Sequence, residues 1–398
     1  MERTSGTANV RWMWIAACGI AVLYVGSTLL TPLYPIYERE FGFDELVVTE
    51  IYAIYVLGNL AVLFFFGRLA DGIGRRPVVL IALAVTIASA ACFLVAGSTL
   101  WLFVARVLNG VGAGLGASAL TAWLAELEPN GDRARAAAFA SAGNLAGLAF
   151  GAIGAGLLVR FAPSPLRLPF AMFIGVLIIV IALLAFAPET VSDPARSMRE
   201  LSLRPRVGVP SGIRLAFVAP AAIAFTAFAL GGFYAALAPG LLSGRLDETG
   251  AVAIGGIVAL FFAAGAVTVV VTRALSNRPA LFAASALLLA GLALLLAADV
   301  ERSMPFLIAA SVAAGASMAL GYRSSLGIVN AIAPGAQRAE VVSSYLLVCY
   351  AANALPVIGV GLLAKATSPT AAHAAFAILL ALLGIAACAI GARHLPKE

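Results

Sequence analysis

The chain has 398 residues, of which 62% are hydrophobic and only 11% carry a charge. An ordinary soluble domain is roughly half apolar and about one quarter charged, so this composition excludes a water-soluble enzyme. It also excludes a disordered chain, which needs low hydrophobicity and a high net charge. The net charge of +6 does not indicate a nucleic-acid partner, because the basic residues fall in short runs between apolar stretches. A protein that crosses a membrane several times remains.

About 20 apolar residues in a helix cross a hydrocarbon core about 30 Å thick. By this measure the sequence predicts an all-α polytopic membrane protein with twelve transmembrane helices. The first, at 12–35, is expected to act as an uncleaved insertion signal, because it is longer than the apolar part of a signal peptide. The others are expected at 46–67, 78–97, 99–125, 136–160, 169–187, 213–237, 251–272, 280–298, 305–331, 341–364 and 371–392.

The basic residues between these helices predict the orientation of the chain. With the N-terminus inside, 17 of the 25 lysines and arginines lie in inner segments and six in outer segments. Arg106 and Arg323 lie within helices. The positive-inside rule therefore predicts a multi-pass plasma (inner) membrane protein with both termini in the cytoplasm. The four cysteines lie in apolar stretches without a Cys-x-x-Cys pair, so we interpret them as small buried side chains.

The segment from Gly67 to Arg76, between the second and third helices, reads GRLADGIGRR. Gly74 permits a backbone turn that is closed to other residues. Asp71 can accept hydrogen bonds from a helix N-terminus, and Arg75 can reach a carboxylate or a lipid head group. On spacing alone, a positively charged inner loop with turn glycines explains the segment equally well.

This segment resembles the loop motif G-x-L-A-D-r-x-G-r-k of the major facilitator superfamily, and departs from it mainly at Gly72. The resemblance implies two pseudo-symmetric six-helix bundles that alternate access to a site near mid-membrane. It also implies a charge relay that latches the two halves in one state and releases them in the other. Its expected members are Asp71, Arg75 and Glu126, with Gly67 and Gly74 as turn positions.

The fourth helix carries Arg106 within the sequence RVLNGVGAG. This stretch resembles a superfamily pattern that is associated with proton-coupled members, with Asn109 in place of Gln. An arginine inside a span usually faces a polar interior, although one near a helix end can extend to the interface instead. Glycines four residues apart, such as Gly110 and Gly114, allow close helix contact.

The fifth helix carries Gly143, Gly147, Gly151, Gly154 and Gly156. In the drug:proton antiporter branch of the superfamily this helix bears Gly-Pro-x-x-Gly-Gly, and here the proline and the last glycine are missing. Close packing and a role in the rocking of the halves explain the glycines equally well. The sequence Pro188-Glu189-Thr190 after the sixth helix resembles the ending of that helix in drug-efflux members.

The polar stretch from Pro188 to Gly212 divides the chain. We expect an N-terminal six-helix half at 1–190, a cytoplasmic central loop at 191–212 and a C-terminal half at 213–398. The halves repeat at a shift of 205, which aligns Pro129 with Pro334 and Arg133 with Arg338. Such duplication is typical of secondary transporters.

A proton-driven carrier usually has a titratable or charged group within the membrane. The coupling candidates are Arg106, Glu50 and Arg323. Glu50 could equally be a solvated residue of a first turn, and Arg323 a structural arginine near the inner mouth. The polar and aromatic candidates for a substrate cavity, each also a possible packing residue, are Tyr24, Thr28, Tyr55, Asn59, Asn144, Tyr234, Tyr350 and Asn353.

The sequence thus predicts a secondary active transporter, with proton-coupled efflux of small, partly hydrophobic compounds (drugs or metabolites) as the favoured function. Uptake or exchange of a sugar or organic anion on the same fold is the alternative, and a non-transporting receptor or scaffold is another. The sequence has only two histidines, no H-E-x-x-H and no P-loop, so we expect no enzyme, no metal and no cofactor. The expected partners are a small-molecule substrate, protons and the lipid bilayer, without nucleic acid, and we expect a monomer.

Overall fold

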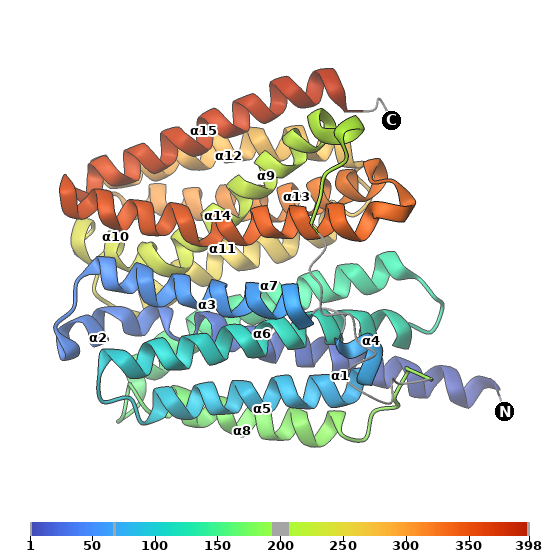
Figure 1. The fold of residues 1–398 in the computed structure, drawn as a ribbon. Helices are drawn as coiled ribbons and strands as arrows, with labels where there is room; N and C mark the ends of the chain where they lie inside the picture. The colour runs from blue at the N-terminus through green and yellow to red at the C-terminus, as the bar shows by residue number, and fades with distance from the viewer. Residues whose placement is uncertain (1, 67–68, 193–206, 396–398) are drawn as a thin grey trace. The chain divides into compact units, whose positions relative to one another are not determined.

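The computed structural model describes residues 2–66, 69–192 and 207–395, and within these ranges the chain forms helices without a strand (Figure 1). Eleven helical segments are long and apolar enough to cross a membrane. The apolar helix α8 (Leu168–Leu184) has 17 residues. At 1.5 Å per residue it is about 26 Å long, which nearly spans the hydrocarbon core. The prediction of twelve membrane-crossing helices is confirmed.

The chain divides into two compact units, which are residues 1–33 with 54–205, and residues 34–53 with 206–398. The helices of the first unit are α1 (Glu2–Thr28), most of α3 (Glu45–Phe66), α4 (Leu69–Ile73), α5 (Arg75–Leu94), α6 (Thr99–Leu127), α7 (Arg133–Phe161) and α8, with the short η1 (Thr31–Leu33). Most of the expected central loop at 191–212, namely residues 193–206, lies outside the described residues.

The second unit contains α2 (Tyr34–Phe41) and the start of α3, at 45–53. Its remaining elements are η3 (Ser211–Ile213), α9 (Arg214–Gly232), η4 (Phe233–Leu237), α10 (Ala238–Arg245), α11 (Ala251–Val271), α12 (Asn277–Glu301), α13 (Met304–Ile332), η5 (Gly335–Gln337), α14 (Arg338–Ala366) and α15 (Pro369–His394). The seventh crossing, expected to end at 237, continues through the π-helical turn η4 into α10. Pro239 lacks a backbone N–H, which fits the irregular turn just before it.

Glycines let helices of the first unit approach each other closely. A Cβ at Gly147 or Gly151 of α7 would overlap a carbonyl oxygen of α1, at Ala21 and Val25 respectively. The glycines of the fifth crossing thus pack against the first crossing at backbone distance, as small-residue interfaces in membranes do. Gly154 has no atom within 4 Å of such a Cβ, so the stripe is used for packing only in part.

The two units repeat helix lengths at the spacing of the predicted duplication. α6 and α13 both have 29 residues, and their first residues, 99 and 304, differ by 205. α7 and α14 also both have 29 residues, and they begin at 133 and 338, again 205 apart. Such agreement in length and offset across two consecutive helices supports an internal repeat.

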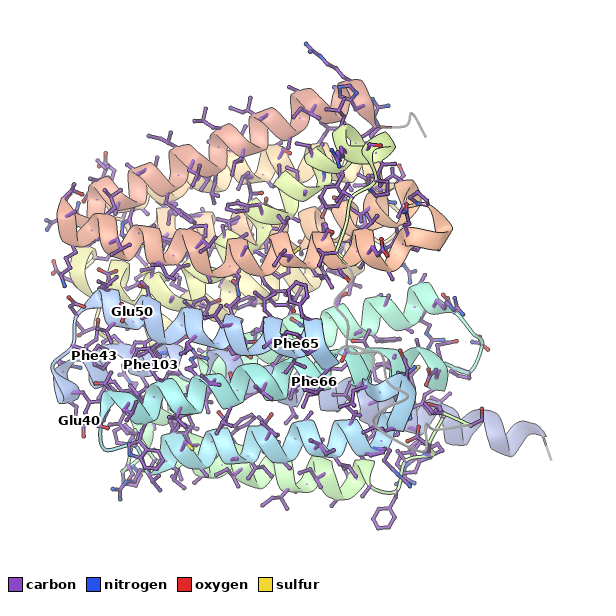
Figure 2. The ribbon with its side chains drawn as sticks, in the orientation of Figure 1. Glu40, Phe43, Glu50, Phe65, Phe66 and Phe103 are labelled. Carbon is purple, nitrogen blue, oxygen red and sulfur yellow. The ribbon has the colours of Figure 1, made fainter. Side chains whose placement is uncertain are left out.

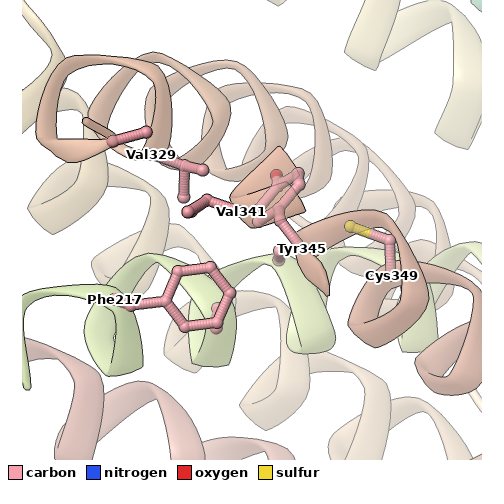
Figure 3. Close-up of a cluster of buried hydrophobic side chains, with 8 residues drawn as sticks. Phe217, Val329, Val341, Tyr345 and Cys349 are labelled. Atoms are coloured by element: carbon pink, nitrogen blue, oxygen red, sulfur yellow. The ribbon is translucent and has the colours of Figure 1, made fainter. Parts of the chain in front are cut away.

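The second unit has a hydrophobic core where α9, α13 and α14 meet (Figure 3). Phe217 of α9, Val329 of α13 and Tyr345 of α14 are buried there together with Cys349. The Tyr345 hydroxyl and the Ser325 hydroxyl form a hydrogen bond of 2.7 Å, so the polar end of the ring is satisfied inside the core. This packing holds α14 against α9.

Candidate functional site

A network of charged side chains joins α4, α5 and α6 at one end of the first unit. Arg75, the first residue of α5, lies with Nη1 2.5 Å from Asp71 Oδ1 and with Nη2 2.8 Å from Glu126 Oε1. Its Nε also donates to Glu126, at 3.2 Å from each carboxylate oxygen. The Thr190 hydroxyl donates to the same carboxylate. The structure therefore brings together the three residues that the resemblance assigned to a relay.

Glu189 adds a third carboxylate to this network, from the segment that follows α8. One of its oxygens accepts from the backbone N–H of Arg75 and the other from that of Arg76, both at 2.9 Å. The first N–H groups of a helix lack partners within the helix, so Glu189 caps α5 from 114 residues away in the sequence. Sequence reasoning missed this role, and the only trace of it was the Pro188-Glu189-Thr190 ending.

The backbone N–H groups around Glu189 also set its charge state. Burial by itself raises the pKa of this carboxyl, but hydrogen bonds from Val191, Arg75, Arg76 and Thr190 outweigh burial, and they hold its pKa below the ordinary value. Glu189 is therefore ionised at neutral pH. It places a negative charge at the N-terminus of α5, where the helix dipole favours it.

Gly74 makes this arrangement possible. Its φ of +108° is a conformation that side chains disfavour. A Cβ at this position would lie 2.7 Å from Glu189 Oε2. Any other residue would strain the turn and displace the capping carboxylate. Gly67, the other turn position of the motif, lies outside the described residues.

The last turn of α6 and the segment after α8 are held together beside the network. Trp123 is fully buried, and its indole N–H donates to the carbonyl oxygen of Pro188 at 3.0 Å. This bond fixes the Pro188-Glu189-Thr190 segment against α6. Glu189 and Thr190 are thus positioned at α5 and Glu126 by a buried anchor.

Arg106 forms a second candidate site within the first unit. Its side chain is fully buried, and Nη1 donates to the carbonyl oxygen of Ser27 at 2.9 Å. The guanidinium carbon lies 5.6 Å from the ring centre of Tyr55, within the range of a cation–π contact. The hydroxyl groups of Tyr55 and Ser27 are 3.2 Å apart. The structure thus places Arg106 in the interior of the bundle and not at an interface.

The other cavity candidates of the first unit differ in burial and in contacts. Asn59 is 2% exposed and packs against Gly114 of α6, where a Cβ would lie 2.9 Å from its Oδ1. The Thr28 hydroxyl donates to the carbonyl oxygen of Leu148 at 2.6 Å, which ties α1 to α7. Tyr24 and Asn144 are half-buried. Thr28 therefore has a structural bond, whereas Tyr24 and Asn144 keep part of their surface accessible.

The candidates of the second unit differ in accessibility. Tyr234 is fully buried and stacks on Phe261, with ring centres 4.2 Å apart. Tyr350 is half-buried, with its ring edge-to-face with Phe228 at 5.9 Å. Asn353 accepts a hydrogen bond from the Tyr52 hydroxyl at 3.0 Å. Tyr350 and its aromatic neighbours offer a partly exposed ring surface, while Tyr234 lies in the core.

The two remaining coupling candidates lie apart from the charged network. Arg323 donates to the backbone carbonyls of Arg273 and Leu275, at 3.4 and 3.0 Å, in the turn that follows α11. An arginine that binds such carbonyls caps the end of a helix. Glu50 is exposed on α3, as is Phe65 in the last turn of that helix (Figure 2). Neither candidate joins Asp71 and Arg75.

Comparison with known proteins gives relatives of one family. A model of the Major Facilitator Superfamily matches residues 16–304. The quinolone resistance protein NorA of Staphylococcus aureus (strain MRSA252) is 27% identical over 180 residues, which are 45% of this chain and 44% of NorA. The MFS-type transporter Rv1250 of Mycobacterium tuberculosis is 31% identical over 120 residues, 29% of this chain and 21% of that protein. The matches thus span less than half the length of these curated relatives.

The solved structures extend the likeness to nearly the whole chain. A bacterial homologue of the human lysosomal transporter Spinster, crystallised in an inward-facing and unoccupied conformation, has a TM-score of 0.71. The match covers 98% of this chain and 99% of that one at 16% identity, which shows a common fold. Together with the family model, which matches well over half of the residues, this establishes that the chain belongs to the Major Facilitator Superfamily.

Proposed function

We propose that the protein is a secondary active transporter of the inner membrane that exports small, partly hydrophobic compounds in exchange for protons. Membership of the superfamily makes it a transporter rather than an enzyme, and alternating access is the mechanism that this fold serves. The observation that carries the proposal is the network around Arg75. Two carboxylates bind its guanidinium while a third holds the start of its helix.

The network has the properties of a latch. Arg75 is 11% exposed in its side chain, so its separation from Glu126 would leave a poorly hydrated charge and is costly. Asp71 is 55% exposed and lies four residues before Arg75. Water can therefore replace Arg75 as the partner of this carboxylate at little cost. In our proposal the network holds α4, α5 and α6 in one arrangement, and the opposite state of the transport cycle requires it to open.

The export direction and the substrate class are argued from the relatives and the polar interior. The curated relative NorA is named for quinolone resistance, and resistance by a membrane transporter implies efflux. Arg106, buried beside Tyr55 and Ser27, is the proposed place where a proton-linked charge is held inside the bundle. We propose that the protein acts as a monomer with both termini in the cytoplasm and without a cofactor.

Uptake or exchange of a sugar or organic anion on the same fold is the second candidate. The incomplete antiporter motif of α7 favours it, because the proline and the last glycine of Gly-Pro-x-x-Gly-Gly are missing there. An anion-binding role of Arg323 is less favoured, since both of its terminal nitrogens donate to backbone carbonyls. The two candidates therefore predict different substrates and not different folds.

Transport measurements in proteoliposomes with an imposed pH gradient test the proposal. We expect the wild type to move ethidium or a fluoroquinolone against its concentration gradient. In Asp71→Asn the transport rate should fall by about tenfold or more, and a tenfold fall corresponds to an activation barrier higher by about 1.4 kcal/mol. Asp71→Glu should restore much of the rate. Glu40→Gln, at an exposed carboxylate outside the network, should transport like the wild type.

Two results would contradict the proposal. If neither compound moves with the proton gradient but organic anions or sugars exchange across the membrane, the second candidate replaces export. If Asp71→Asn transports as fast as Glu40→Gln, the network is not a latch.

A further inference from the structure

Three ionisable residues from three helices meet at one end of the second unit. Arg245 is the last residue of α10, Asp299 lies near the end of α12, and His373 lies in the first turns of α15. Arg245 Nε lies 2.7 Å from Asp299 Oδ1, and His373 Nδ1 lies 3.3 Å from Asp299 Oδ2. One carboxylate therefore binds a guanidinium with one oxygen and an imidazole with the other.

This cluster is deeply buried. Asp299 is 1% exposed and His373 is 3% exposed. A buried carboxylate is stable as an ion only when it is paired and hydrogen-bonded, which Arg245 achieves from a partly exposed position. The imidazole packs edge-to-face against Phe233 of η4, with ring centres 5.5 Å apart. One side of the imidazole is thus covered by an aromatic ring, and the partly exposed Arg245 lies at the edge of the cluster.

The second nitrogen of His373 has no hydrogen-bond partner among the described residues. Because Asp299 can only accept, the neutral imidazole carries its hydrogen on Nδ1 and leaves Nε2 as a bare acceptor. A buried polar atom without a partner is uncommon in folded proteins and needs an explanation. A proton is the smallest species that this atom can bind.

A further carboxylate is available to balance the charge that such a proton would bring. When His373 is neutral, the charges of Arg245 and Asp299 already cancel each other. Glu45, the first residue of α3, interacts electrostatically with His373. Its Oε1 lies against α10, 2.8 Å from the position of a Cβ on Gly240. With a charged His373, the set has two positive and two negative members.

Glu38 of α2 and Asp44 lie within electrostatic range of Glu45, and the remaining ionisable groups of the packed elements have different partners or lie elsewhere. Lys365 of α14 pairs with Asp44 at 2.9 Å. Glu301 is exposed beyond Asp299 on α12. The basic residues of α9 and of the rest of α15 lie at the opposite ends of those helices, at Arg214, Arg393 and His394.

We propose that His373 is a proton-binding site, whose imidazolium is held by Asp299 and balanced by Glu45. Proton uptake at Nε2 then adds an attraction between α15 and the first turn of α3, and proton release removes it. Residues 45–53 of α3 belong to the second unit and the rest of that helix to the first. The site thereby links a proton to α3, a membrane-crossing helix whose residues belong to both units.

This inference deepens the proposed function, because it names a group that could take the exchanged proton. It concerns proton binding alone and needs no knowledge of the transported compound. A failed transport assay would leave the site intact, and a failed titration would leave export to be explained by another group.

Nitrogen-15 NMR of histidine-labelled protein in lipid bilayers tests the site directly. The chain has only two histidines, so the spectrum contains two imidazoles, and His394→Gln assigns them. His394 is exposed and serves as the internal reference. We expect the His373 ring signals to change from neutral to charged within about pH 5 to 8, with the Nδ1 hydrogen retained throughout.

Two variants test the partners. In Asp299→Asn the His373 midpoint should move toward acid by about one pH unit or more, because the carboxylate that holds the imidazolium is gone. Glu45→Gln should move it in the same direction by less, and this variant also serves if Asp299→Asn does not fold. Glu40→Gln, the matched exposed control, should leave the midpoint unchanged.

The site is disproved if His373 stays neutral over this range while His394 titrates. It is also disproved if the wild-type midpoint is unchanged in both Asp299→Asn and Glu45→Gln.

Discussion

Glu189 orders the start of α5 through two backbone hydrogen bonds, and these bonds depend on its charge. Its carboxyl has a pKa below the ordinary value of 4.5, because the backbone N–H groups favour the ionised form over the neutral one. A group whose pKa is depressed in the folded state contributes stability above its pKa in the unfolded chain. That contribution is lost as the pH falls through the lower pKa of the folded state.

Glu189→Gln should therefore be less stable than the wild type at pH 7, by about 1 kcal/mol, the usual cost of a lost helix cap. The difference should shrink as the pH falls from about 5 to 3, because the wild-type carboxyl becomes protonated as well. Thermal unfolding in detergent at several pH values measures both effects. Glu301→Gln, at an exposed carboxylate, is the control. A difference that stays constant with pH would show that the charge of Glu189 does not matter.

At the scale of helices, the close approach of α6 to α3 recurs between α13 and α11. A Cβ at Gly110 would overlap the carbonyl oxygen of Tyr55, and a Cβ at Gly315 would overlap that of Phe261. The two glycines are 205 residues apart, which is the shift of the repeat. The atoms in the way are backbone, which cannot move aside as a flexible side chain can.

Gly110→Ala and Gly315→Ala should each destabilise the protein by about 1 to 3 kcal/mol, because the paired helices must separate. Gly154→Ala and Gly359→Ala are matched controls, since they too are 205 apart and a Cβ at either would meet no atom within 4 Å. We expect the controls to unfold within a few degrees of the wild type. Equal unfolding temperatures for all four variants would refute the close contacts.

At the scale of the whole molecule, the number of crossings and the charge of the loops predict the topology. Twelve crossings put both termini on one side of the membrane, and the basic residues favour the cytoplasmic side. The exposed turns at Gly97 and Gly131, before and after α6, should then lie on opposite sides.

Alkaline phosphatase fused after Gly97 should be active in intact bacteria, because the enzyme folds only outside the cytoplasm. The same enzyme fused after Gly131 or at the C-terminus should be inactive, while a green fluorescent protein at the C-terminus should fluoresce. Cell fractions blotted for the fusions control for expression. Activity after Gly131 together with inactivity after Gly97 would mean that the chain is inverted.

The membrane class, the number of crossings and the repeat were readable from the sequence, because each depends on local composition or on spacing along the chain. The pair of Asp71 and Arg75 is local in the same sense, since the two residues are one helical turn apart. Glu126 was found only through the family resemblance, because 51 residues separate it from Arg75.

The sequence by itself determined that this chain must fold as apolar helices in a membrane, since a continuous apolar run of about 20 residues satisfies its backbone in hydrocarbon by forming a helix. Only the tertiary structure decided which polar groups those helices bring together. Glu189 caps a helix that begins 114 residues earlier, and His373 meets Asp299 across 74 residues. Contacts of this kind depend on how helices pack, and helix packing is set by surfaces along their whole length that no local pattern records.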